Sequence, residues 1–237
     1  MEALEKSYGF VLKHILKAVN PIKKKIIKTE CKVHKFINNQ AIEILKNDGN
    51  EEAYDFLSKY MRDINSGVVW ADQDFKSSNH FYNPEKNRGL YGASNALKEA
   101  TYYYTKAINL YKEGKINASA FYLGSSCHII QDMTVPQHVN IKLLDSHRKY
   151  ELWVIKTYLI HDSFKIEKGG IYLNSIKDFI EENAKIAIEA YLKYKHLPNK
   201  EERYFKITEE ILTQAQKTTA GMMLKYFNDV TKINNIN

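Results

Sequence analysis

The chain has 237 residues, which is enough to bury a sizeable core within one domain. Its 35 lysines and arginines exceed its 28 aspartates and glutamates, for a formal net charge of +7. This balance favours anionic partners without choosing between a phospholipid surface and a nucleic acid. Two cysteines give no disulfide framework, and no run of about 18 apolar residues predicts a transmembrane helix.

The first element expected is an N-terminal extension helix within residues 1–33. Apolar residues recur at helical spacing from Tyr8 to Val19, and a lysine-rich segment, residues 21–28, follows them. That segment predicts a helix with a solvated lysine face, and the alternative is a helix lying on a membrane interface. The region does not read as a secretory signal, because lysines interrupt the apolar residues and no small-residue cleavage site follows.

Residues 34–237 are expected to form one all-α domain, a multi-helix bundle with a loop-borne metal cluster. Residues 64–93 are rich in loop-forming residues, and this loop would carry Asp72 and His80. Apolar periodicity predicts a helix over 97–111, with Ser94 as its N-cap and Gly114 beyond its end. Further helices are expected over 117–134, 176–194 and 211–227, while strand-like alternation is scarce.

The stretch from Gly124 to His138 indicates a metal site. On a helix, His128 and Asp132 are four residues apart and project from one face, and Pro136 would turn His138 back towards them. His147 and Glu151 form a second pair with the same spacing. A single pair of this kind is commonly an ordinary hydrogen-bonded pair. Five candidate ligands within two dozen residues favour a zinc cluster instead, since imidazole and carboxylate groups suit this ion.

Three residues further upstream extend this set, namely His34, Asp72 and His80. With them, the order of histidines and acids resembles that of the bacterial zinc-dependent phospholipases C, which include the small Bacillus enzymes and the catalytic domain of clostridial alpha-toxin. The resemblance covers about residues 30–155. Phe121-Tyr-Leu-Gly, the His-x-x-x-Asp helix leading to Pro-x-His, and His80-Phe-Tyr-Asn-Pro carry it most specifically.

The resemblance implies two to three zinc ions. One would be held by Asp72, His80, His128 and Asp132, and a second by His138, His147 and Glu151. Asp132 would bridge to a third ion at His34. In the family a free N-terminal tryptophan completes that third site, whereas this chain begins far upstream of His34 and has no tryptophan between. Cys31 could supply a substitute thiolate there or pack as a small apolar residue, and Cys127 is expected to pack.

The resemblance also implies the reaction, a phospholipase C cleavage of a glycerophospholipid to diacylglycerol and a phosphorylated head group by metal-bound hydroxide. Asp72 would be both ligand and catalytic base, with Asp74 as the alternative if the loop alignment shifts by two. Rival readings are a zinc nuclease of the P1 type and a non-catalytic membrane-binding relative. The partner expected is a phospholipid at a membrane surface. Nucleic acid is not favoured, and no obligate protein partner is evident.

Members of this family are usually exported, so the resemblance implies secretion, although no signal peptide is readable. A cytoplasmic location is the alternative.

Overall fold

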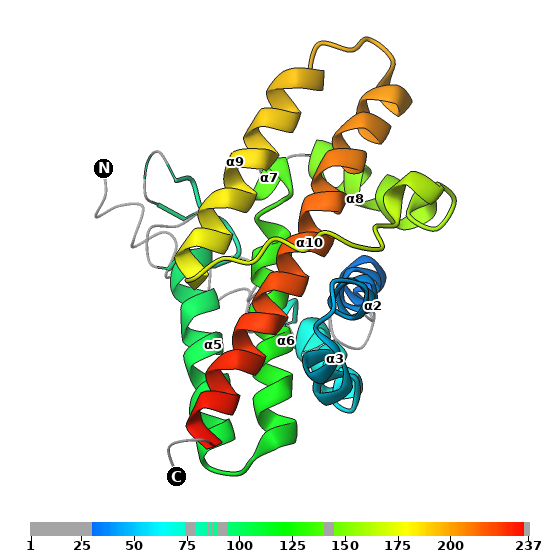
Figure 1. The fold of residues 1–237 in the computed structure, drawn as a ribbon. Coiled ribbons are helices and arrows are strands. Elements are labelled where there is room, and N and C mark those ends of the chain that lie inside the picture. The colour runs from blue at the N-terminus through cyan, green and yellow to red at the C-terminus, as the bar shows by residue number, and fades with distance from the viewer. Residues whose placement is uncertain are drawn as a thin grey trace, which may run out of the picture.

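The computed structural model describes residues 30–73, 79–84, 86, 88–89, 94–139 and 145–234, which build a bundle of helices (Figure 1). In chain order the elements are α2 (Lys32–Asn47), α3 (Glu51–Ser58), α4 (Met61–Ala71), α5 (Ala96–Lys112), α6 (Ile116–Asp132), α7 (Pro136–Val139), α8 (Asp145–Thr157), the 3-10 helix η2 (Asp162–Phe164), α9 (Ile176–Tyr194) and α10 (Lys200–Asn234). Within the described residues, the strand-like pairing is one isolated bridge, between Asn83 and Arg88. The predicted all-α bundle is confirmed. None of the described helices is both long enough and apolar enough to span a membrane.

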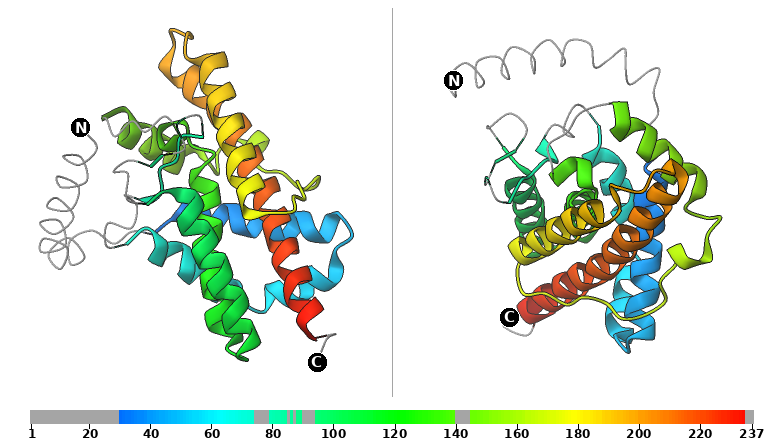
Figure 2. Two further views of the ribbon diagram at one scale, coloured as in Figure 1. Left: turned by 90° about the vertical axis from the view of Figure 1, so that its left-hand side faces the viewer. Right: turned by 90° about the horizontal axis from the view of Figure 1, so that it is seen from above.

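Helix α6 occupies the centre of the bundle. It packs against α4 and α5, and α10 and α9 contact it as a second, antiparallel pair (Figures 1 and 2). Its second half is buried without a break from Leu123 to Asp132. A helix that is buried on every side has no solvent face. The polar residues at its C-terminal end therefore face other protein groups, and this is where His128 and Asp132 stand.

Two glycines let α4 and α6 approach at backbone distance. A Cβ atom added to Gly67 of α4 would lie 1.8 Å from the carbonyl oxygen of Phe121, and one added to Gly124 of α6 would lie 1.9 Å from that of Ile64. Neither position can accept a side chain without separating the helices. Because Asp72 directly follows α4, this close crossing brings its carboxylate towards the metal-ligand candidates of α6.

Several boundaries differ from the sequence prediction. The predicted loop over 64–93 is wrong at its start, because α4 continues to Ala71 with Ile64, Val68 and Ala71 buried at helical spacing. The cap of α5 is Asn95, not Ser94: the Asn95 side chain accepts from the backbone of Lys98, while the Ser94 hydroxyl donates to Glu99. Gly114 does follow α5 with a φ of 74°, as expected of a helix end.

The last predicted helix, over 211–227, is the central part of a much longer one, α10. Charged residues dominate its first turns, where apolar periodicity is weak. The N-terminal stripe from Tyr8 to Val19, the lysine-rich segment and Asp74 lie outside the described residues, and of the extension helix predicted over 1–33 the structure describes residues 30–33. Lys32 and Val33 already belong to α2.

Candidate metal centre

Asp132 stands at the meeting point of three histidines. Its Oδ2 atom accepts from His80 Nδ1 at 2.7 Å and lies 3.2 Å from His128 Nε2, and its Oδ1 atom lies 3.5 Å from His34 Nε2. The His34 ring stacks on that of His128 with 4.1 Å between centroids. These side chains come from α2, from the segment before α5 and from α6, so three parts of the chain converge on one buried carboxylate.

A hydrogen bond fixes the orientation of His34. Its Nδ1 atom lies 2.8 Å from Oε1 of Gln131, whose own amide nitrogen donates to Asn38 and Thr219. Because that amide nitrogen already serves as a donor, the oxygen faces His34 and His34 Nδ1 carries the proton. The Nε2 atom of His34 is then an acceptor, and it faces the Asp132 carboxylate, which is also an acceptor. A cation between the two would remove this mismatch.

His138, His147 and Glu151 form a second group. His147 Nε2 lies 2.9 Å from Glu151 Oε1, and the rings of His138 and His147 meet edge to face with 4.9 Å between centroids. His138 donates from Nδ1 to the backbone carbonyl of His80 at 3.1 Å and stacks on Phe81. This bond leaves Nε2 of His138 unprotonated, which is the tautomer that binds a metal through Nε2.

Asp72 lies beside the first group but does not bond to Asp132. Its Oδ2 atom is 3.9 Å from the thiol sulfur of Cys31, and the charges of His128, Asp132 and His80 act on it. Burial raises the pKa of the Asp72 carboxyl, and the neighbouring Asp132 carboxylate raises it further.

The pKa values of the side chains in the first group shift in different directions. Burial opposes ionisation of Asp132, but the charges of His128 and His138 and the bonds from His128 and His80 lower its pKa well below the usual range. Burial likewise opposes protonation of His128, but Asp132 raises the pKa of His128 well above normal. Burial and then the His128 charge lower the pKa of His34 to about 4, so His34 is neutral at pH 7.

The donor set fits zinc. Cradles of three candidate ligands are formed by His34, His128 and Asp132, and by His138, His147 and Glu151, with the ligand atoms of each group within 4.8 Å of one another. Three ring nitrogens, His80 Nε2, His128 Nδ1 and His147 Nε2, are buried and meet no partner of hydrogen-bonding geometry in the described structure. Buried polar atoms normally have a partner. Imidazole nitrogens and carboxylate oxygens at this density are the ligands that zinc takes.

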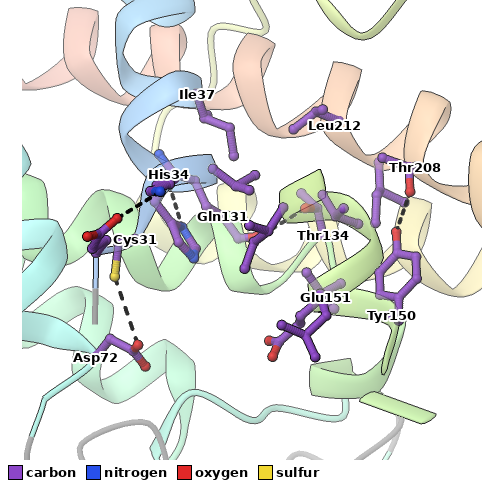
Figure 3. A pocket seen from close by; sticks show the side chains of 18 residues that line it. Cys31, His34, Ile37, Asp72, Gln131, Thr134, Tyr150, Glu151, Thr208 and Leu212 are labelled. Carbon is purple, nitrogen blue, oxygen red and sulfur yellow. Dashed lines mark hydrogen bonds and ion pairs between the residues drawn. The ribbon is translucent and has the colours of Figure 1, made fainter. Parts of the chain in front are cut away.

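A cavity of about 490 Å³ opens beside both groups (Figure 3). Cys31, His34, Asp72 and Glu151 face it from the metal-ligand side. The opposite wall is mostly aliphatic and is formed by Val33, Ile37, Val135, Leu152, Val154, Ile155, Ile211 and Leu212. A Tyr150 to Thr208 hydrogen bond of 2.8 Å is set into this wall. The cavity therefore joins an end lined by His34, Asp72 and Glu151 to an apolar end.

Seven of the eight ligand residues predicted from the sequence lie in the two groups. The first contains His34, His80, His128 and Asp132, the second His138, His147 and Glu151, and Asp72 lies at the edge of the first. Sequence reasoning missed Gln131, because an amide is not a zinc ligand. Its position directly before Asp132 in a fully buried stretch of α6 was the available signal, since a buried glutamine needs partners.

The chain is similar in sequence to a known protein family and to known proteins. Residues 33–197 match the family model described as zinc dependent phospholipase C. The chain is 24% identical over 240 residues to a phospholipase C of Paraclostridium bifermentans, and 27% identical over 177 residues to one of Bacillus cereus. These alignments take in 85% and 67% of this chain. The chain spans only 60% and 62% of the length of those two relatives.

Solved structures agree on the fold. The alpha-toxin from Clostridium absonum superposes with a TM-score of 0.76 at 20% identity, covering 89% of this chain and 67% of the toxin chain. The alpha-toxin of Clostridium perfringens gives 0.74 at 21% identity, covering 87% and 65%. Together with the family match, these findings confirm the resemblance that the order of histidines and acids predicted.

Proposed function

The chain belongs to the zinc-dependent phospholipase C family, and from this membership we propose that it hydrolyses a glycerophospholipid to diacylglycerol and a phosphorylated head group. We propose two to three zinc ions. Asp72, His80, His128 and Asp132 would hold one, His138, His147 and Glu151 a second, and His34 with Asp132 a third. When bound, the zinc ions would polarise the phosphodiester and make a water molecule more acidic.

The residues of this chain have separate tasks in that reaction. Asp72 is the proposed base: it would accept the proton of the water whose oxygen bonds to phosphorus, and the glycerol oxygen would take up a proton as its own bond to phosphorus breaks. Its position beside the first group and in the lining of the cavity supports this assignment. The Gln131 amide and the His80 carbonyl hold His34 and His138 in the tautomers that leave Nε2 available.

The observation that carries the proposal is the cavity with two unlike ends. A phosphodiester carried by two acyl chains needs a cationic centre for the phosphate and an apolar surface for the glycerol and the first chain carbons. The aliphatic wall formed by α2, α8 and α10 supplies that surface beside the metal-ligand candidates (Figure 3). A nucleotide would instead need aromatic or hydrogen-bonding groups for its base. In this wall Tyr150 and Thr208 are already hydrogen-bonded to each other, and the remaining side chains are aliphatic.

An exposed apolar ridge extends from the same wall. Leu152 and Ile155 of α8 line the cavity and are still 46% and 44% exposed, and Leu159 and Ile160, just beyond α8, are 71% and 69% exposed. Exposed basic residues of the same helix accompany them, namely Arg148, Lys149 and Lys156. Aliphatic side chains flanked by cationic ones suit the surface of an anionic bilayer. We propose that the ridge rests on the membrane that contains the substrate.

The experiment is a substrate comparison with the purified, zinc-loaded chain. We expect diacylglycerol from short-chain phosphatidylcholine or phosphatidylethanolamine, loss of the activity on chelation, and no cleavage of a single-stranded oligonucleotide. Asp132→Asn, prepared in parallel, controls for contaminating enzymes. Cleavage of the oligonucleotide alone would replace the proposal with a nuclease. Zinc binding with no turnover of either substrate would leave a non-catalytic protein.

A further inference from the structure

We propose that the thiolate of Cys31 is a zinc ligand of this centre, facing the cavity between Asp72 and His128. This inference deepens the proposed function, since it rests on zinc binding at the site, but it does not require that a phospholipid is the substrate. The ligand set so formed combines one sulfur with the nitrogen and oxygen donors already described.

The backbone holds Cys31 in an unusual conformation. Its φ and ψ are 46° and 44°, and it is the one residue other than glycine with positive φ in the described part of the chain. L-residues avoid this left-handed region, and cysteine has no special tolerance for it. Cys31 directly precedes α2, but its side chain caps no backbone amide of that helix. Helix capping therefore does not account for the conformation, which occurs together with the approach of the thiol to Asp72.

The surroundings of the sulfur are those of a ligand. Sγ lies 3.9 Å from Asp72 Oδ2, and the thiol lies against the His128 ring, with which it interacts electrostatically. His128 is only 2% exposed, and its Nδ1 atom meets no partner of hydrogen-bonding geometry within the described structure. His34, three residues after Cys31, directs its unprotonated nitrogen into the same region. A thiol, two imidazoles and a carboxylate thus lie close together, and Nδ1 of the buried His128 ring has no partner of hydrogen-bonding geometry among the described residues.

A zinc ion bound among these side chains would account for their arrangement. Zinc binds thiolate together with imidazole and carboxylate, and the Cys-x-x-His spacing of Cys31 and His34 places both side chains at the start of one helix. Binding would convert the thiol to a thiolate with release of its proton to solvent, so the new negative charge would offset half of the charge of the ion.

Cys127 provides an internal contrast. It adjoins His128 in sequence, but it is completely buried and packs within the main hydrophobic core. Burial raises the pKa of both thiols, that of Cys127 to about 12. Both cysteines therefore lie close to His128. Cys31 lines the cavity, whereas Cys127 packs among apolar side chains. This pair supplies a matched control for any experiment on thiol ligation.

The test uses cobalt in place of zinc in the full chain, because thiolate bound to Co²⁺ gives a near-ultraviolet charge-transfer band that imidazole and carboxylate do not. We expect this band in the wild-type protein and in Cys127→Ala, and its loss in Cys31→Ser with at least a tenfold weaker affinity for one of the bound ions. Cobalt binding without the band in Cys127→Ala would overturn the proposal. Absence of any cobalt binding would instead overturn the proposed metal centre as a whole.

A second measurement needs no folded variant. Alkylation of the wild-type chain, followed by peptide mass analysis, reports each cysteine separately. We expect Cys31 to react in chelated protein and to be protected at least tenfold when zinc is added, whereas Cys127 remains unreactive in both states. Equal reactivity of Cys31 with and without zinc would contradict ligation.

Discussion

His34 and Gln131 are joined by a hydrogen bond of 2.8 Å between Nδ1 and Oε1, although 97 positions separate them in the chain. This bond fixes the histidine tautomer from outside the group of metal-ligand candidates, and a second bond ties Gln131 to Asn38 on the same helix as His34. The orientation of His34 thus depends on a buried amide network that connects α2 to α6.

We expect Gln131→Met to lower zinc affinity roughly 10- to 100-fold, because His34 then loses the acceptor that selects its tautomer. Titration with a zinc indicator measures this directly. The matched control is Gln214→Met, which removes another buried glutamine whose side-chain amide donates to Asn183 and not to a metal-ligand candidate. If both variants lose affinity equally, the effect reflects general destabilisation and not the His34 bond.

Asp72→Asn should abolish hydrolysis of a short-chain phospholipid while the thermal unfolding temperature stays within a few degrees of wild type. The carboxylate is a proposed base, and asparagine preserves its volume but accepts no proton. Asp74→Asn, two positions further on, should be milder. Reversed behaviour of the two variants would show that Asp74 is the reactive carboxylate.

Replacing the ridge residues should separate membrane binding from catalysis. Leu159→Ser with Ile160→Ser removes two of the most exposed aliphatic side chains, so we expect roughly tenfold weaker sedimentation with anionic vesicles. Hydrolysis of a monomeric short-chain phospholipid should be unchanged. Leu192→Ser serves as control, because Leu192 is 51% exposed on α9, outside the ridge. Equal vesicle binding by all three proteins would contradict the proposed docking surface.

Gly67→Ala and Gly124→Ala should each destabilise the fold by at least about 2 kcal/mol, since the added methyl group meets a backbone carbonyl of the facing helix. Chemical denaturation measures the free energy of unfolding. Ser66→Ala, one residue before Gly67 on the exposed side of α4, should change stability by less than about 0.5 kcal/mol. A tolerated alanine at either glycine would mean that the two helices can separate at little cost.

Apolar periodicity was sufficient to predict α5 and α9 closely, because each buries one face at a spacing of three and four residues. It failed at residues 64–71, where asparagine, serine and glycine read as loop signals although Gly67 serves a close helix contact. Loop composition and helix packing select the same small residues for different reasons, so one sequence cannot distinguish them.

The candidate site likewise has one part that the sequence predicts and another that it does not. The spacing of His128 with Asp132 and of His147 with Glu151 sets pairs on one helix face, which local geometry alone predicts. The meeting of Cys31 with Asp72 depends on a left-handed residue before α2 and on where α4 ends. The partnership of His34 with Gln131 depends on how α2 crosses α6. Both are consequences of tertiary packing, which spacing along the chain does not encode.

The crossing of α4 and α6 at Gly67 and Gly124 also determines how stiff the metal centre is. Since backbone touches backbone there, the separation between the end of α4 and the histidine-bearing end of α6 cannot drift through side-chain rearrangement. Heating would leave that separation nearly constant until the helices part. Escape of the ion and loss of the helix contact should then occur at the same temperature, as a single event.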